Sequence, residues 1–161
     1  MNETKKSLAE EALDLVMPSI ETLLVEKAKR THVHIVIMDP RKKPWECEFT
    51  DAIWYERSIT NDEPWERDYT AFARAKANQA WREGQHGIVV TALAPATLRH
   101  GDTVYDGSFC YNGVIVACSG VEPYFDMLIS AWVALAIQQL SQHQIQTYRA
   151  ENPNEAFVPT E

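Results

Sequence analysis

Hydrophobic residues recur at helical spacing through the first thirty residues of the chain. The apolar positions are Leu8, Ala12, Leu15, Val16, Ile20, Leu23 and Leu24, and charged residues lie between them. This spacing gathers the apolar side chains on one face and predicts a helix over residues 4–30. Because Pro18 lies inside the pattern, we expect a kink there or two abutting helices.

Two strands are predicted after this helix. Residues 33–39 (VHIVIMD) alternate poorly and are rich in β-branched side chains, which indicates a central strand buried on both faces. Residues 39–43 (DPRKK) have the composition of a turn. From about Glu46 to Glu56, we expect a second strand that pairs antiparallel with the first and keeps one face in solvent, because its first apolar residues alternate with acidic ones.

A second long helix is predicted in the middle of the chain. Pro64 suits the first helical turn, and residues 61–63 place cap oxygens and negative charge at the positive end of the helix. Gly84 suits a C-terminal stop, so we expect the helix to run from Pro64 to Gly84. Residues 87–94 (GIVVTALA) fit either a strand or a loop.

The rest of the chain predicts a hairpin and a last helix. Residues 103–111 and 114–119 are two short predicted strands, joined at Asn112-Gly113, a strong two-residue turn signal. A helix is then expected over about 124–148. The order of elements favours an α+β fold, an antiparallel sheet with flanking helices.

Length and charge restrict the function. With 161 residues the chain suits a single domain, which we assign to residues 4–148, and the polar, proline-bearing tail 149–161 is expected to be mobile. The net charge of −8 argues against nucleic acid or an anionic membrane as the main partner. No signal-peptide pattern or span-length apolar run is seen, and three cysteines lie in no metal spacing, which favours a reducing, cytoplasmic location.

Positive charge gathers in residues 67–100, which carry a net +3 although the whole chain is acidic. Solvated surface charge would explain this segment. The alternative is a cationic face for a small anion or for an acidic surface of another subunit.

Lys76 is the most unusual residue of this segment. On a helical projection it falls in the middle of an apolar arc, whose other members are Tyr69, Phe72, Ala73, Ala77 and Ala80. An ammonium among apolar neighbours must find acceptors or a ligand anion, or else lose its proton. Either Lys76 extends past the alanines to water or to a structural partner, or it contacts an anion in a pocket.

The histidines and cysteines offer weaker candidates. His32 and His34 share one side of a predicted strand and could hold one metal ion, but no third ligand is fixed by spacing. His86 and His100 are expected in loops, where either could be an axial haem ligand or a general base. Cys110 is most simply a small core residue, although a Cys–His nucleophilic pair stays open.

The predicted last helix is apolar nearly all round over residues 127–137 (MLISAWVALAI). Such a helix lies either in the centre of a domain or between subunits. We therefore expect self-association through residues 124–140, giving a homo-oligomer.

Three stretches together resemble the GlcG/HbpS-like family of small proteins. Residues 36–39 (VIMD) are similar to the family's strand that ends in Asp, and residues 73–80 (ARAKANQA) to its Ala-Arg-x-Lys-Ala-x-x-Ala helix. Residues 107–113 (GSFCYNG) and 116–121 (VACSGV), followed by Asp126, lie where the family has two strands and a turn glycine. The similarity covers most of residues 5–142 in order and spacing. The family's glycine-rich first turn is replaced here by PRKK (40–43).

The resemblance implies a profilin-like order α-β-β-α-β-β-β-α, an oligomer, and in some members haem binding. It carries over Lys76 as a pocket residue or structural anchor, and it fixes no haem ligand. The candidate ligand-contacting residues are Lys76, Arg74, His86, His100, Ser108 and Cys110. No metal ligand and no catalytic residue are assigned.

Our main hypothesis is a protein that binds haem or another anionic small molecule and acts as a homo-oligomer. One alternative is an enzyme that acts on a small carbonyl or carboxylate compound through Lys76 and a His or Cys. Another is a structural or regulatory partner subunit.

Overall fold

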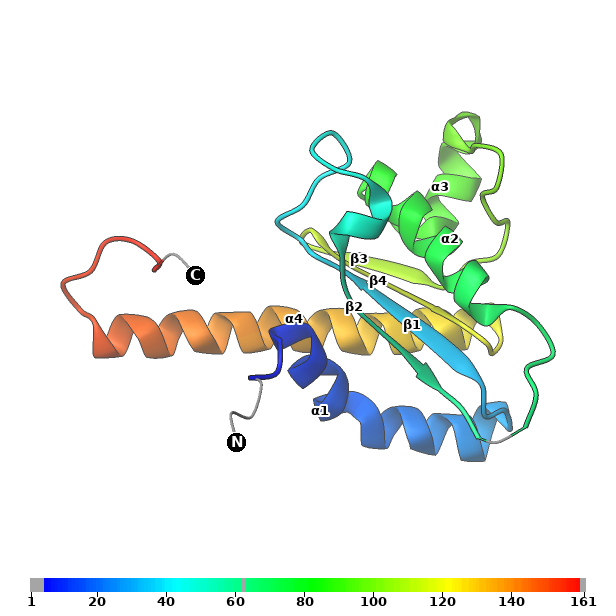
Figure 1. The fold of residues 1–161 in the computed structure, drawn as a ribbon, viewed down its shortest axis with the longest axis horizontal. Helices are drawn as coiled ribbons and strands as arrows, with labels where there is room; N and C mark the ends of the chain where they lie inside the picture. Colours follow the sequence, from blue (N-terminus) through cyan, green and yellow to red (C-terminus); the bar gives the residue numbers. More distant parts are fainter. Residues whose placement is uncertain (1–4, 62, 160–161) are drawn as a thin grey trace.

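Four antiparallel strands in the order β2-β1-β4-β3 form the sheet of the computed structural model, which describes residues 5–61 and 63–159 (Figure 1). The strands are β1 (Val33–Met38), β2 (Ile53–Ile59), β3 (Ser108–Tyr111) and β4 (Val114–Ser119). The helices are α1 (Leu8–Leu23), α2 (Tyr69–Glu83), α3 (Gly87–Leu93) and α4 (Pro123–Glu151). The predicted α+β class and antiparallel sheet are therefore present.

Helices cover both faces of the sheet. Figure 1 shows α1 and α4 on one side and α2 with α3 on the other. Val33, Ile35 and Ile37 of β1 pack in the core formed with α1 and α4. Val36 and Met38 pack in the core formed with α2. All six β1 residues are buried, as predicted for a central strand.

α1 begins at a Ser7 cap, whose hydroxyl accepts the Glu10 N–H, and it contains Pro18. Figure 1 shows the change of direction in α1 that a proline interior to a helix predicts. A turn of π-helix (Leu24–Ala28) follows and ends at Lys29, whose φ is 53°.

The second strand starts later than predicted. Residues 43–52 form local turns and a short 3₁₀-helix (Phe49–Ala52), since the Glu46 N–H bonds the Lys43 carbonyl and the Asp51 N–H bonds the Glu48 carbonyl. Trp45 is 81% exposed. The alternation of apolar and acidic residues there does not mark a strand, and pairing with β1 begins at Ile53.

The bounds of α2 are also corrected at its start. Pro64 lies in the preceding loop, and the helix begins at Tyr69 because the Asp68 side chain caps it by accepting the Ala71 N–H. Asn61 instead accepts the Glu63 N–H in a local turn. The Gly84 stop is confirmed, with φ of 64°.

Residues 87–93 are helix α3, neither strand nor loop. The expected order α-β-β-α-β-β-β-α is therefore wrong in one element, and the observed order is α-β-β-α-α-β-β-α. Of the expected strand over 103–111, only Ser108–Tyr111 forms β3. The Asn112-Gly113 hairpin turn is confirmed, with positive φ at both residues.

α4 runs to Glu151, and Figure 1 shows its second half extending past the sheet. Of the predicted tail 149–161, residues 149–151 belong to α4, residues 152–159 are irregular, and residues 160–161 lie outside the described part of the chain. The mobility of the tail stays a prediction. Among the helices of residues 5–61 and 63–159, none is both long enough and apolar enough to cross a membrane.

Candidate functional site

Lys76 lies in the buried face of α2, as the helical projection predicted. Its side chain is only 3% exposed, so it does not reach bulk water. The ammonium donates to Asp126 Oδ2 at 2.9 Å and to the Cys118 carbonyl at 3.0 Å. Asp126 lies in the first turn of α4, and Cys118 in β4. Lys76 thus joins α2 to the sheet and to α4.

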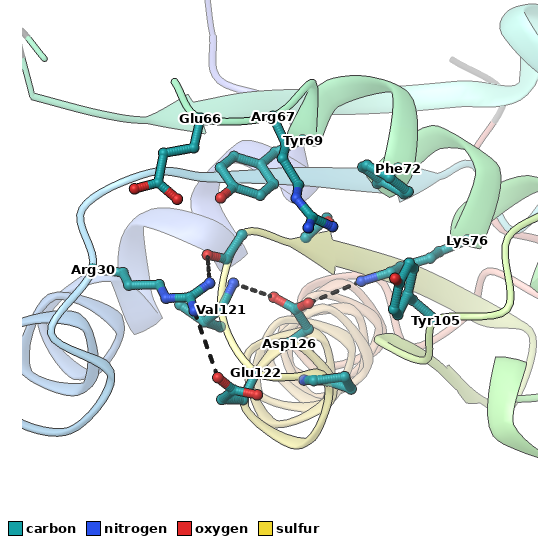
Figure 2. A pocket seen from close by; sticks show the side chains of 13 residues that line it. Arg30, Glu66, Arg67, Tyr69, Phe72, Lys76, Tyr105, Val121, Glu122 and Asp126 are labelled. Carbon is teal, nitrogen blue, oxygen red and sulfur yellow. Dashed lines mark hydrogen bonds and ion pairs between the residues drawn. The ribbon is translucent and has the colours of Figure 1, made fainter. Parts of the chain in front are cut away.

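A pocket of about 270 Å³ lies beside this ion pair, where the N-terminal ends of α2 and α4 approach the end of β4 (Figure 2). We call it the α2–α4 pocket. Its lining residues are Arg30, Glu66, Arg67, Tyr69, Phe72, Lys76, Tyr105, Ser119, Gly120, Val121, Glu122, Pro123 and Asp126. Aromatic rings and charged groups therefore share its walls.

Several polar groups of the pocket lack a partner within the part of the chain that the structure describes. An ammonium has three N–H groups, and two of those of Lys76 are bonded. The hydroxyls of Ser119 and Tyr69 make no hydrogen bond to the described residues, although Ser119 is 5% and Tyr69 8% exposed. Arg67 forms no ion pair there, and Figure 2 shows its guanidinium pointing into the pocket.

Asp126 and Arg30 have partners among their neighbours. Burial raises the pKa of Asp126 to about 6, although the Lys76 ammonium and the Val121 N–H both favour its ionised form. At the mouth, Arg30 bonds the Gly120 carbonyl at 3.5 Å and faces Glu122 at 3.6 Å. The basic lining residues Arg30, Arg67 and Lys76 are matched in number by the acidic Glu66, Glu122 and Asp126. The positive end of α4, whose first turn contributes Pro123 and Asp126 to the lining, also faces the pocket.

The six candidate residues do not form one site. Arg74 makes two hydrogen bonds to Glu56, on the far side of α2 from the pocket residues. The His86 Nδ1 accepts the Cys110 N–H at 2.9 Å, and its ring lies 4.6 Å from that of Phe109. These contacts give Arg74 and His86 structural partners.

Ser108 and Cys110 lie close to His86 at the edge strand β3. The Ser108 hydroxyl accepts the Gly87 N–H at 2.8 Å, which fixes the start of α3. The Cys110 thiol faces the Gly84 carbonyl at 3.3 Å, and burial raises its pKa, which disfavours the thiolate. His86, Ser108 and Cys110 therefore cover a sheet edge, and of the six only Lys76 lines the α2–α4 pocket.

His100 lies in the loop after α3, at a separate cavity of about 620 Å³. That cavity is bordered by Glu48, Glu83 and the buried Arg82–Asp102 ion pair. Arg99 also lines that cavity, so basic and acidic groups both surround His100. Among the described residues that line the α2–α4 pocket, none is a His, Cys or Met, the common axial ligands of haem iron. Haem binding therefore stays a prediction of the sequence resemblance.

His32 and His34 do not form a metal site. His34 Nδ1 lies 2.8 Å from Ser58 Oγ and its Nε2 lies 3.0 Å from Glu56 Oε2, so both ring nitrogens are engaged. His32 Nδ1 lies 2.7 Å from the Thr60 hydroxyl. Within the described ranges, no group of three or more His, Cys, Asp or Glu residues could hold a metal ion.

Sequence reasoning missed most of the pocket. Asp126 and Ser119 lie in the stretch that carries the family resemblance. No sequence pattern around them predicted that Asp126 pairs with Lys76 or that Ser119 lines the pocket. Arg30 and Arg67 follow no motif. The signal that remained was the lysine in an apolar arc, which required an acceptor from another element.

The fold is similar to two solved structures. Klebsiella pneumoniae protein ORFY, of family DUF336, matches with a TM-score of 0.55 and 14% identity over 86% of this chain and 97% of ORFY. The Ybr137w protein matches with a TM-score of 0.53 and 15% identity, over 84% of this chain and 81% of that protein. No protein-family model and no curated protein matches the sequence. The chain therefore has the α+β fold of the DUF336 (GlcG/HbpS) protein ORFY, as the sequence resemblance implied.

Proposed function

We propose that this protein binds a small anionic molecule in the α2–α4 pocket. The observation that carries the proposal is the buried Lys76, whose third N–H has no acceptor in the described part of the chain and which lines the pocket. A buried donor left without an acceptor is costly, so an anionic oxygen at this position gains a charge-assisted hydrogen bond.

Arg67 supplies the charge that attracts the ligand. The Lys76 charge is balanced by Asp126, whereas the Arg67 guanidinium points into the pocket without an ion-pair partner in the described ranges. A planar guanidinium binds a carboxylate through two parallel hydrogen bonds. A carboxylate between Arg67 and Lys76 would be held from both sides.

The other walls restrict the rest of the ligand. Phe72 and Tyr105, whose rings are 5.8 Å apart, offer an apolar surface, and the Ser119 and Tyr69 hydroxyls offer hydrogen bonds. The volume of 270 Å³ is just below the range of about 300–1,000 Å³ typical of drug-sized ligands. We therefore expect a small carboxylic acid with an apolar or hydroxylated part.

Thermal unfolding with propionate, benzoate, succinate and inorganic phosphate tests the proposal, followed by calorimetric titration of any anion that raises the Tm. A ligand that binds only the folded state stabilises it in proportion to the logarithm of its concentration. We expect at least one carboxylate to bind, and the Arg67→Gln variant to bind it at least about tenfold more weakly through loss of a charged hydrogen bond.

Arg149→Gln is the matched control, because Arg149 lies in the last turn of α4 and lines no part of the pocket. It should bind like the parent protein. If no anion of the panel binds, or if Arg67→Gln binds as tightly as the parent, the proposal is wrong.

Binding is better supported than catalysis by Lys76. No histidine or cysteine lines the pocket within the described chain, and the ammonium is already bonded to a carboxylate and a carbonyl. The enzyme hypothesis required a His or Cys near Lys76. Cys118 lies beside the Lys76–Asp126 pair, but burial raises the pKa of its thiol, which disfavours the reactive thiolate.

We also propose that the chain forms a homo-oligomer through α4. One stripe of this helix repeats at alternating four- and three-residue spacing, the pattern of a coiled-coil seam. Its positions are Tyr124, Leu128, Ala131, Leu135, Gln138, Gln142 and Ile145. Leu128, Leu135 and Ile145 are each more than a third exposed, so the apolar stripe has no full cover within the described chain.

Light scattering during size-exclusion chromatography tests this assembly. We expect a multiple of 18.3 kDa for the parent chain and 18.3 kDa for the Leu128→Glu/Leu135→Glu variant, because buried glutamates destabilise a helix–helix seam. Gln139→Glu, a charge change outside the stripe, is the control. A monomeric parent at tens of micromolar would contradict the proposal.

A further inference from the structure

Four polar side chains form a hydrogen-bonded line on the α2 side of the sheet, outside the α2–α4 pocket. Ser58 Oγ lies 2.8 Å from His34 Nδ1, and His34 Nε2 lies 3.0 Å from Glu56 Oε2. Arg74 of α2 donates to both Glu56 oxygens. The pairing of β1 with β2 creates this line, because His34 and Ser58 are directly opposite each other in the register.

The direction of the hydrogen bonds follows from the charge on Glu56. Arg74 and His34 together outweigh burial and hold the pKa of Glu56 below its usual value, so this carboxylate is an acceptor only. The His34 proton therefore belongs on Nε2, facing Glu56, when the ring is neutral. That leaves Nδ1 with a free lone pair, and the Ser58 hydroxyl is placed to donate to it.

Accessibility differs between the two groups. The His34 side chain is 6% exposed, whereas Ser58 is exposed and lies on β2, an edge strand of the sheet. A hydroxyl bonded to a base, with the base oriented by a third group, is the general arrangement of an activated nucleophile. Here the base is shielded from solvent and the nucleophile is open to it.

A second imidazole–hydroxyl pair lies two residues away and lacks this arrangement. His32 Nδ1 is 2.7 Å from the Thr60 hydroxyl, but Thr60 can donate to the Asn61 carbonyl at 2.8 Å and accepts from Trp65. No carboxylate bonds His32 in the described part of the chain. Proximity to histidine alone therefore does not distinguish Ser58, whereas the Glu56–Arg74 pair does.

We propose that Ser58 is a base-activated nucleophile that accepts an acyl group from an activated ester. Ser58 Oγ forms a bond to the acyl carbon, the bond from that carbon to the leaving oxygen breaks, and its electron pair departs with the leaving group. The hydroxyl proton passes to His34 Nδ1, and Glu56 stabilises the resulting imidazolium before the proton is released to water. The product is an ester of Ser58 and one equivalent of the leaving alcohol or phenol.

Acetylation by p-nitrophenyl acetate tests the proposal. The release of p-nitrophenolate is followed by absorbance, and the modified residue is located by peptide mass spectrometry. Ser58 should acquire the acetyl group much faster than Ser19, an exposed serine of α1. His34→Gln should slow acetylation of Ser58 about a hundredfold, in keeping with loss of a general base.

Further variants separate activation from folding. Glu56→Gln keeps the size of the side chain and should also slow the reaction, and Ser58→Ala should abolish it at this site. Thr60→Ala should leave the rate unchanged. Circular dichroism establishes that each variant is folded before its rate is compared. Equal rates at Ser58 and Ser19, or an unchanged rate at Ser58 in folded Glu56→Gln, would overturn the proposal.

Discussion

A lysine in the apolar face of a helix needs acceptors inside the protein, and the first turn of α4 provides one in Asp126. The 2.9 Å contact joins residues fifty positions apart in the sequence, and both side chains are nearly fully buried. Burying both charges is costly, and their attraction offsets this cost only while both are present. The helical projection could predict that Lys76 is buried, but not which carboxylate it meets.

Replacing Lys76 alone should therefore be strongly destabilising. In Lys76→Met, Asp126 stays buried without its ammonium partner, and we expect the free energy of unfolding to fall by about 3–5 kcal/mol at pH 7. Urea unfolding monitored by tryptophan fluorescence measures the change.

The double variant Lys76→Met/Asp126→Asn is the control for this interpretation. The asparagine removes the buried charge and keeps an oxygen for the Val121 N–H. It should recover most of the lost stability. If it is no more stable than Lys76→Met, the cost lies in the packing of the lysine stem and not in the orphaned carboxylate.

Glu56 should give the stability of the protein a measurable pH dependence. In the folded state the pKa of Glu56 lies below its usual value of 4.5, mainly because Arg74 donates hydrogen bonds to the carboxylate. The ionised form therefore favours folding, and this stabilisation is present above about pH 4.5 and is lost as the pH falls through the lower, folded pKa. Glu56→Gln should be less stable than the parent at pH 7, and the difference should shrink towards pH 3. Unfolding curves of both proteins at pH 7, 5, 4 and 3 measure this difference in the free energy of unfolding. A difference that stayed constant across these pH values would contradict the account.

At the scale of elements, predictions held where one local signal dominated. β1 is a run of buried apolar residues, Asn112-Gly113 fits a hairpin turn, and Gly84 ends α2. The predictions of secondary structure failed where tertiary contacts outweighed the local preference of the residues. The β-branched residues of 87–93 form a helix whose start is fixed by the Ser108 hydroxyl and whose Val90 is buried. Propensity is a weak guide for so short a segment.

The turn from β4 into α4 depends on a glycine that packs against the start of β1. A Cβ at Gly120 would lie 2.0 Å from the His32 carbonyl oxygen, and the φ of 144° is itself unfavourable for other residues. Gly120→Ala should lower the free energy of unfolding by at least about 2 kcal/mol, since backbone strain alone costs about 1–3 kcal/mol. It should also weaken ligand binding, because Gly120 lines the α2–α4 pocket.

Gly101→Ala is the matched control. Gly101 also has positive φ, 94°, but a Cβ there meets nothing within 4 Å. Gly101→Ala should therefore lower the free energy of unfolding only through the unfavourable backbone conformation of the alanine. Equal losses in the two variants, measured by urea unfolding, would show that the close approach to His32 contributes nothing.

At the scale of the molecule, the pocket is assembled from segments that no local pattern connects. Lys76 comes from α2, Asp126 from α4, Ser119 from β4 and Arg30 from the turn before β1. Of the six residues predicted as ligand contacts, three instead cover the β3 edge, one pairs with Glu56 and one borders another cavity. Spacing along the chain predicts neighbours within an element. Strand register and helix crossing decide neighbours between elements.

The second half of α4 should contribute to self-association and little to the folding of the single chain. No residue in 141–159 is buried, and the last fully buried side chain of α4 is that of Ile137. A chain that ends at Leu140 should therefore unfold with a free energy within about 1 kcal/mol of the parent when both are diluted to monomers. It should also self-associate more weakly, because the Gln142 and Ile145 positions of the seam are missing. Denaturant unfolding at low concentration and light scattering at high concentration measure the two effects on the same samples. A large loss of monomer stability would mean that the projecting half supports the fold itself, and undiminished association would move the subunit contact to another face.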